Sequence, residues 1–161
     1  MTRCFVALWP PDEVIEAMVA LQTGVDGARW SRRENLHVTL RFLGEVDVDA
    51  AIAAVAAVRH PPVEVVLGPA AGAMFGHVLA APVAGVDGLA AAVRASTVDL
   101  VPDDKRPYRG HLTLGRVPEG IEVSWAPPAS MSWTADRFAL VSSRYDGDRH
   151  VYETITEVVL V

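Results

Sequence analysis

A four-residue pattern that occurs twice constrains this chain more than any other feature of its sequence. The two tetrads are His37–Leu40 (HVTL) and His111–Leu114 (HLTL), and each lies in a run typical of a β-strand. Successive side chains of a strand alternate between its two faces, so each histidine shares a face with the threonine two residues later. Each strand therefore offers one imidazole and one hydroxyl to the same surface, while its apolar residues point into a core.

The spacing of the tetrads indicates an internal duplication. They are 74 positions apart in a chain of 161 residues, and each follows a predicted strand and helix. Two similar lobes related by an approximate two-fold axis would bring His37 and His111 face to face across a cleft. Histidine is the side chain whose ordinary pKa lets one copy be protonated and another neutral near physiological pH. We therefore predict one shared site, with a general acid opposite a general base, suited to in-line displacement at phosphorus.

The order of predicted elements indicates an α+β or mixed α/β architecture. Pro10 and Pro11 precede a helix that is expected to end near Gly24, Gly44 is expected to close the first tetrad strand, and Asp47 is expected to cap the next helix. Strands are predicted at 2–9, 36–43, 62–67, 77–81, 138–143 and 151–161, besides the second tetrad, with helices at 12–24, 47–60 and 86–100 and a loop at 102–107. A hairpin turn is predicted at Asp146-Gly147.

Composition bounds the class of protein. The length suits a single domain spanning residues 1–161. The net charge of −6 argues against a broad basic face that coats nucleic acid, although thirteen of the fourteen basic residues are arginines, which suit local phosphate contacts. The single cysteine, Cys4, indicates a reducing compartment, and we find no secretory signal or membrane span. These features predict a soluble, cytoplasmic protein.

A metal site is the main chemical alternative for the paired histidines. Such sites need three or more cysteine, histidine or carboxylate donors, whereas the tetrads supply hydroxyls without an associated acidic cluster. The remaining histidines, His60, His77 and His150, lack a partner motif and are interpreted as structural or solvated. We predict no catalytic metal and no other cofactor.

The tetrads and their flanks resemble the two-histidine phosphoesterase superfamily, and within it the LigT-like RNA 2′,3′-cyclic phosphodiesterases, also called the 2′-5′ RNA ligase family. The resemblance covers nearly all of the chain and rests on residues 3–11, 29–44, 106–116 and 140–143, with Gly147 and Tyr152. It implies a bilobal α+β LigT-like fold with a pseudo-two-fold axis. In that fold, two antiparallel-type sheets flank a central cleft and the helices lie outside.

The resemblance also implies roles for individual residues. His37 matches the general acid that protonates a departing 3′ oxygen, and His111 matches the base that activates water. Thr39 and Thr113 would donate hydrogen bonds to phosphate oxygens. Arg116 matches a position associated with phosphate contact.

Two aromatic residues, Trp30 and Phe5, are candidate stacking surfaces for a terminal base, and core packing is an equal alternative for Phe5.

The implied reaction is metal-independent opening of a terminal 2′,3′-cyclic phosphate to a 2′-phosphate. The expected partners are RNA termini or short nucleotides bearing that group, and a site completed within one chain indicates a monomer. Two alternatives stay open: 2′-5′ RNA ligation, in which a 5′ hydroxyl replaces water, and a non-catalytic protein that binds RNA ends.

Overall fold

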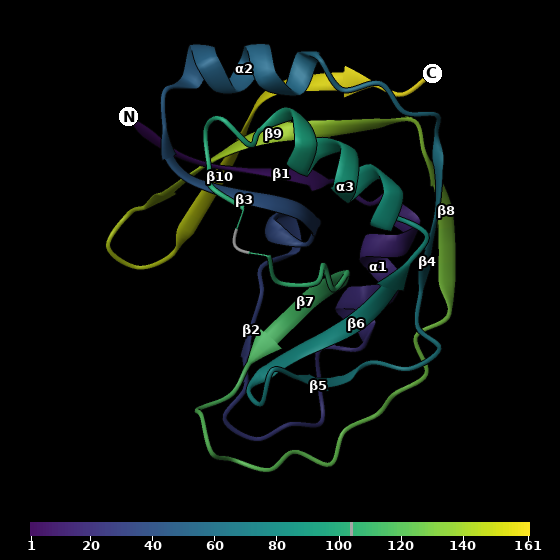
Figure 1. Ribbon diagram of the computed structural model, residues 1–161. Coiled ribbons are helices and arrows are strands. Elements are labelled where there is room, and N and C mark those ends of the chain that lie inside the picture. The colour runs from purple at the N-terminus through teal and green to yellow at the C-terminus, as the bar shows by residue number, and fades with distance from the viewer. Residues whose placement is uncertain (104) are drawn as a thin grey trace.

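The chain forms a predominantly antiparallel β-sheet with helices packed against it, which confirms the α+β class (Figure 1). A computed structural model describes residues 1–103 and 105–161, so position 104 of the predicted loop lies outside the described residues. The helices are α1 (Asp12–Ala20), α2 (Val48–Ala56) and α3 (Asp87–Ser96), with a short 3-10 helix at Arg33–Asn35. The strands are β1 (Thr2–Leu8), β2 (Arg29–Trp30), β3 (Val38–Val46), β4 (Val63–Leu67), β5 (Gly72–Met74), β6 (Val78–Ala84), β7 (His111–Arg116), β8 (Met131–Ala135), β9 (Arg137–Tyr145) and β10 (His150–Val159).

The sheet consists of two halves joined at its centre. Its strand order is β10-β9-β1-β3-β7-β6-β4-β8, with β2 paired to β7 and β5 paired to β6. The two halves meet where β3 and β7 pair antiparallel at Val38 and Leu112. The β3–β7 pairing therefore joins the two expected sheets into one. It also satisfies backbone groups that would otherwise lie at an open sheet edge.

Each half repeats one arrangement around its tetrad. The tetrad strand pairs antiparallel with the strand that precedes the intervening helix: β3 pairs with β1 across α1, and β7 pairs with β6 across α3. This repetition is the structural form of the duplication that the spacing of the tetrads predicted.

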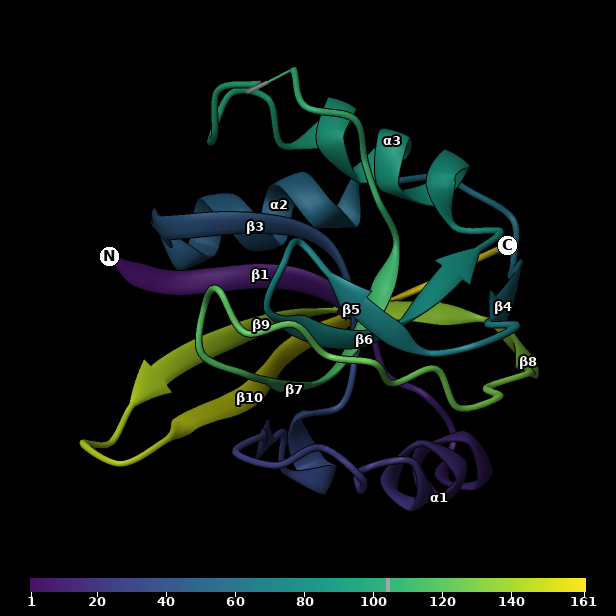
Figure 2. The same ribbon diagram turned by 90° about the horizontal axis from the view of Figure 1, so that it is seen from below.

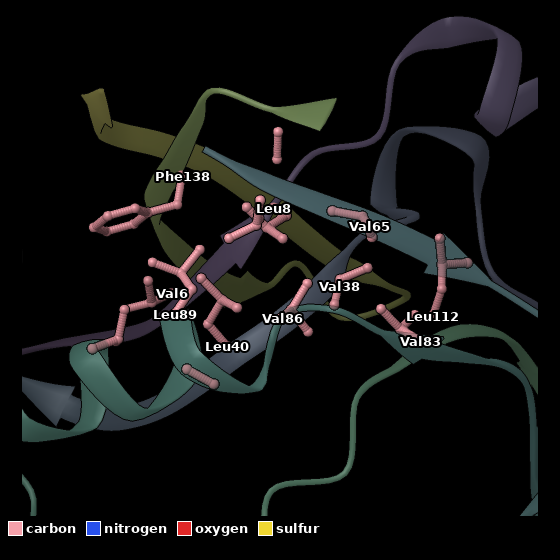
Figure 3. Packing of buried hydrophobic residues seen from close by; sticks show 14 of the residues in the cluster. Val6, Leu8, Val38, Leu40, Val65, Val83, Val86, Leu89, Leu112 and Phe138 are labelled. Carbon is pink, nitrogen blue, oxygen red and sulfur yellow. The ribbon is translucent and has the colours of Figure 1, made fainter. Parts of the chain in front are cut away.

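The main hydrophobic core lies on the face of the tetrad strands opposite to the two histidines. Val38, Leu40, Leu112 and Leu114 are at most 5% exposed and belong to it. Figure 3 shows the first three of these in the cluster, with Leu40 near Leu89 of α3 and Leu112 near Val83 of β6. Helices α2 and α3 lie together on one side of the molecule, and α1 lies on the opposite side (Figure 2). The apolar residues of the tetrads thus face the core, as their alternation predicts.

The predicted boundaries fail at Gly44, which does not close its strand. It lies inside β3 with a φ of 73°, a left-handed conformation that glycine adopts without strain. Cys4 pairs with Gly44 and Phe5 pairs with Phe42, so Leu43 is an extra residue in a β-bulge. The glycine permits the bulge rather than the end of the strand.

Other elements differ from the prediction in length more than in kind. The Asp47 carboxylate caps α2 as expected, accepting a hydrogen bond of 2.8 Å from the Ala50 N–H, but that helix ends at Ala56 rather than near His60. Helix α3 also ends before the predicted residue 100. Strands β2, β5 and β8 were not predicted, because runs of two to five residues carry little periodic signal.

Arg41 joins the first tetrad strand to the C-terminal end of α3. Its guanidinium donates to the carbonyl oxygens of Arg94 and Val101, each at 2.7 Å, and to the Thr97 hydroxyl at 2.8 Å. The carbonyls at a helix C-terminus lack partners within the helix and carry partial negative charge, so a cation there satisfies both needs. This arginine, although adjacent to the tetrad, has a structural use.

We expect the substitution Arg41→Met to lower the free energy of unfolding by about 2 kcal/mol, because it removes charge-assisted hydrogen bonds to partly buried acceptors. Urea denaturation followed by circular dichroism measures the change. Arg59→Met is the matched control, since Arg59 also donates to two carbonyls at the C-terminal end of a helix but is exposed. Equal losses for both variants would contradict the assignment of Arg41.

Candidate active site

The antiparallel pairing of β3 with β7 brings the two tetrads together. Because Val38 lies opposite Leu112, one step along each strand places His37 next to Thr113 and Thr39 next to His111. Each of these four side chains lies on the face opposite to the main core. The structure therefore assembles both histidines and both threonines into one cluster at the junction of the two halves.

Both tetrads carry a β-bulge at their fourth residue. In β3, Val6 pairs with Arg41 and Ala7 pairs with Thr39, which leaves Leu40 without a partner. In β7, Leu79 pairs with Gly115 and Ala80 pairs with Thr113, which leaves Leu114 without one. A bulge shifts the alternation of side chains by one residue. The repeat therefore extends beyond the sequence pattern to an irregularity of the backbone.

The bulge in β7 decides where Arg116 lies. Without it, Arg116 would fall three positions from Thr113 and hence on the opposite face of the strand. With Leu114 as the extra residue, Arg116 returns to the face of His111 and Thr113. Burial raises the pKa of Tyr152, and the positive charge of Arg116 opposes this rise. The ring of Tyr152 contacts that of His37.

His37 is held on both ring nitrogens. Its Nδ1 lies 2.6 Å from the carbonyl oxygen of Asn35, which can only accept, so Nδ1 carries a proton. Its Nε2 lies 3.0 Å from the Thr39 hydroxyl. Nε2 is therefore the nitrogen that can gain or lose a proton beside the cluster.

Aromatic side chains enclose the His37 ring. The ring centroids of Phe5, Tyr152 and Trp9 lie 4.9, 5.5 and 5.8 Å from that of His37. This burial is the largest cause of a lowered pKa for His37, because it disfavours the charged imidazolium. The Asn35 carbonyl partly opposes the effect, and the nearby His111 adds to it. The unliganded site thus favours the neutral ring.

His111 repeats the backbone anchor of His37. Its Nδ1 lies 2.9 Å from the carbonyl oxygen of Arg109, again two residues before the histidine. The Phe75 ring contacts it edge-on at 5.2 Å, and the Arg109 guanidinium lies 5.1 Å from the centre of that phenylalanine ring. In both histidines Nδ1 therefore contacts the backbone two residues earlier, which leaves Nε2 as the nitrogen available to the cluster.

A cavity of about 430 Å³ lies beside the second tetrad. Its lining includes Tyr108, Arg109 and Gly110, which directly precede His111, and Ala80 and Pro82, which pair with Thr113 and His111. A volume of this size is typical of sites that hold a small ligand. This cavity therefore lies on the His111 side of the cluster, although neither histidine lines it, whereas the His37 side is packed with aromatic rings.

Comparison with known proteins agrees with this geometry. A family model described as LigT like Phosphoesterase matches residues 8–69, which include the first tetrad. A comparison with curated protein sequences found no significant match. Among solved structures, E. coli LigT complexed with NADP+ is 25% identical with a TM-score of 0.83, over 99% of this chain and 98% of that chain. The protein TT0787 of Thermus thermophilus is 26% identical with a TM-score of 0.84, over 98% and 97%.

The family model over residues 8–69 and the shared fold over nearly the whole chain support the LigT-like two-histidine phosphoesterase superfamily. The MHV ns2 PDE domain shares its fold, at 16% identity and a TM-score of 0.58 over 87% of this chain and 99% of that one. Crystal structures of E. coli LigT hold 3′-AMP, ATP or phosphate. This likeness supports a function of the phosphoesterase or 2′-5′ ligase type.

Within this LigT-like site, the two aromatic residues singled out from the sequence have different places. Phe5 is 2% exposed and packs against the His37 ring, so its surface is already covered. Trp30 pairs with Gly115 on β7 and packs against Trp125 at 5.8 Å. The bulge puts Gly115 on the face opposite to Thr113, so the structure does not bring Trp30 to the histidines.

The site also contains residues that the sequence did not single out. Tyr152 and Trp9 contact His37, and the backbone of Asn35 orients it. Tyr152 belongs to a segment that carried the family resemblance, so its position in the chain was a usable signal. The Asn35 contact uses a carbonyl oxygen, which every residue has, so no side-chain pattern could have revealed it.

Residues 1–103 and 105–161 contain no group of three or more His, Cys, Asp or Glu side chains close enough to hold a metal ion. In the same residues, no helix has the length and apolar character needed to cross a lipid bilayer.

The lowered pKa of His37 predicts how stability depends on pH. Between the folded-state pKa and the unfolded value of about 6.5, the unfolded chain binds a proton that the folded one resists. The free energy of unfolding therefore falls as the pH drops below the unfolded-state value of about 6.5. The stabilisation that His37 contributes is fully present above that pH. We expect the free energy of unfolding of His37→Gln to fall less than that of the unmodified protein when the pH is lowered from about 7.5 to below the folded-state pKa of His37. Denaturation in phosphate-free buffer tests this, and identical pH profiles would contradict it.

Proposed function

We propose that this protein hydrolyses the terminal 2′,3′-cyclic phosphate of RNA or oligonucleotides to a 2′-phosphate, without a metal, using His37 and His111 as the proton-transfer pair. The observation that carries the proposal is the juxtaposition of the two tetrads, in which the β3–β7 pairing places a histidine beside the other strand's threonine. A near-symmetric pair suits in-line displacement, since the attacking and leaving oxygens lie on opposite sides of phosphorus.

In the proposed reaction, His111 Nε2 accepts a proton from water as the water oxygen attacks phosphorus. The bond from phosphorus to the 3′ oxygen breaks, and His37 Nε2–H donates its proton to that oxygen. The product carries a 2′-phosphate and a free 3′ hydroxyl. The Thr39 and Thr113 hydroxyls donate to the non-bridging oxygens, where negative charge builds up in the transition state.

The acid role of His37 requires that its ring be protonated when substrate is bound. Burial favours the neutral ring in the unliganded site. A cyclic phosphate is an anion, and an opposite charge beside the ring raises its pKa again. Substrate binding is therefore coupled to proton uptake at His37, which prepares the acid only when there is a bond to break.

The substrate class is supported by local charge and by the relatives. Burial raises the pKa of Tyr152, whose ring contacts His37, and Arg116 and Arg3 both oppose this rise, so two positive charges act near the site in an acidic protein. E. coli LigT structures contain 3′-AMP and phosphate. All of the proposed groups come from one chain, so the reaction requires no second copy.

A second candidate function, 2′-5′ RNA ligation, is favoured by the cavity beside His111. In that reaction a 5′ hydroxyl replaces water as the attacking group, on the side of His111, the proposed general base. A cavity of about 430 Å³ there offers room for the nucleoside that carries such a hydroxyl. Adding an excess of RNA with a free 5′ hydroxyl and resolving joined from hydrolysed products separates the two reactions.

We expect His37→Ala and His111→Ala each to lower kcat/KM for a cyclic-phosphate RNA by roughly 100-fold to 10,000-fold, the range that general acid–base catalysis contributes. Chromatography that resolves 2′-phosphate from 3′-phosphate products, with and without a chelator, gives the measurement. His60→Ala, outside the site, is the control. Inhibition by the chelator that added zinc reverses would contradict the mechanism, and RNA binding without turnover would favour the non-catalytic alternative.

We expect Thr39→Val and Thr113→Val to reduce kcat by roughly 100-fold, because each removes a hydroxyl donor to the transition state while keeping the shape of the side chain. Thr113→Ser, which keeps the hydroxyl, should retain most of the activity. A valine variant that raises KM alone would show that the hydroxyl serves ground-state binding instead.

A further inference from the structure

A line of aromatic rings leads from His37 to the tip of the hairpin formed by β9 and β10. Tyr152 contacts His37 edge-on with ring centroids 5.5 Å apart. His150 lies 6.2 Å from Tyr152 with 30° between the ring planes, and Tyr145 lies 5.2 Å from His150. We refer to Tyr152, His150 and Tyr145 as the aromatic ladder.

The strand geometry places the ladder on one surface. Tyr152 and His150 are two positions apart on β10, and Tyr145 is the register partner of His150 on β9, so all three side chains share a face. The Asn35 side-chain amide donates to the His150 carbonyl at 3.1 Å, which ties the hairpin to the segment that orients His37. The ladder is therefore fixed relative to the site.

Exposure increases along the ladder away from His37. Tyr152 is half-buried, His150 is exposed and Tyr145 is 61% exposed. The hairpin turn is ordered by the Asp146 carboxylate, which accepts from the N–H groups of Asp148 and Arg149. Adjacent exposed rings continuous with a phosphate site form a stacking platform, the feature by which proteins hold unpaired bases irrespective of sequence.

We propose that the aromatic ladder binds the bases of single-stranded RNA that precede the terminal cyclic phosphate. The preferred substrate is then an oligonucleotide rather than a mononucleotide. This inference rests on the proposed hydrolysis for the position of the RNA end, but the binding it describes needs no turnover.

The direction of the RNA follows from the in-line geometry. The leaving 3′ oxygen faces His37, and this oxygen belongs to the terminal ribose, so the ribose and the chain attached to it lie on the His37 side. The attacking water lies on the His111 side, next to the cavity. The chain therefore leaves the site over Tyr152, where the ladder begins.

The charges beside the ladder favour stacking over phosphate contacts. Arg144 lies 3.6 Å from the Glu153 carboxylate, and Arg149 lies 3.6 Å from that of Asp146. Each of these cations thus has an anion beside it, in a protein of net charge −6. Binding dominated by stacking releases few counterions, so its affinity depends only weakly on salt.

The test compares a tetranucleotide and a mononucleoside, each ending in a 2′,3′-cyclic phosphate. The measured quantity is kcat/KM for the tetranucleotide divided by kcat/KM for the mononucleoside. We expect Tyr145→Ala and His150→Ala each to lower this ratio by about 10-fold, the loss typical of one stacking ring. Tyr145→Phe keeps the ring and should keep the ratio. Thermal melting shows whether each variant is folded.

A binding measurement separates the ladder from the reaction. Fluorescence anisotropy with a labelled tetranucleotide ending in a 2′-phosphate should show weaker binding to Tyr145→Ala and a shallow salt dependence. If no cyclic phosphate is turned over but this ring-dependent binding persists, the ladder stands and the proposed hydrolysis fails. If hydrolysis occurs and the ratio of kcat/KM values is unchanged in both alanine variants, the proposed role of the ladder is wrong. It is also wrong if binding is steeply salt-dependent and insensitive to the Tyr145 substitution.

Discussion

The pairing of β3 with β7 is the interaction on which the rest of the site depends. It joins the halves of the sheet at Val38 and Leu112, whose side chains are fully buried on the core face. The neighbouring positions on the other face belong to the histidines and threonines. A shift of one residue would exchange the two faces, moving the histidines into the core and the apolar side chains into the site. Burial of the core therefore fixes the position of the chemistry.

The bulges at the fourth residue of each tetrad make the two halves similar in backbone, but the residues that follow them differ in chemistry. The residue five positions after each histidine returns to the site face, and it is Phe42 in one half and Arg116 in the other. Phe42 lies 6.0 Å from Phe5, next to the rings around His37. The repeat thus supplies the two facing histidines, and the equivalent position after them holds a phenylalanine in one half and an arginine in the other.

The same asymmetry gives the two histidines different surroundings. His37 is packed among aromatic rings that lower its pKa, and those rings continue outward as the aromatic ladder. His111 directly follows Tyr108, Arg109 and Gly110, which line the cavity. In the proposed mode of RNA binding, aromatic faces would carry much of the contact, so few cations would be needed in a protein with a net charge of −6.

The sequence by itself determined the α+β class, the two tetrad strands, the Asp47 cap and the pairing of His37 with His111 as a hypothesis, because periodicity and capping are local properties of a chain. It could not determine the bulges, since Leu40 and Leu114 read as ordinary apolar positions of regular strands. Only the tertiary structure decided that Arg116 faces the site while Trp30 packs away from it, and that Tyr152 contacts His37. These outcomes depend on which residues of neighbouring strands are paired, and that choice is made by packing between segments far apart in the chain.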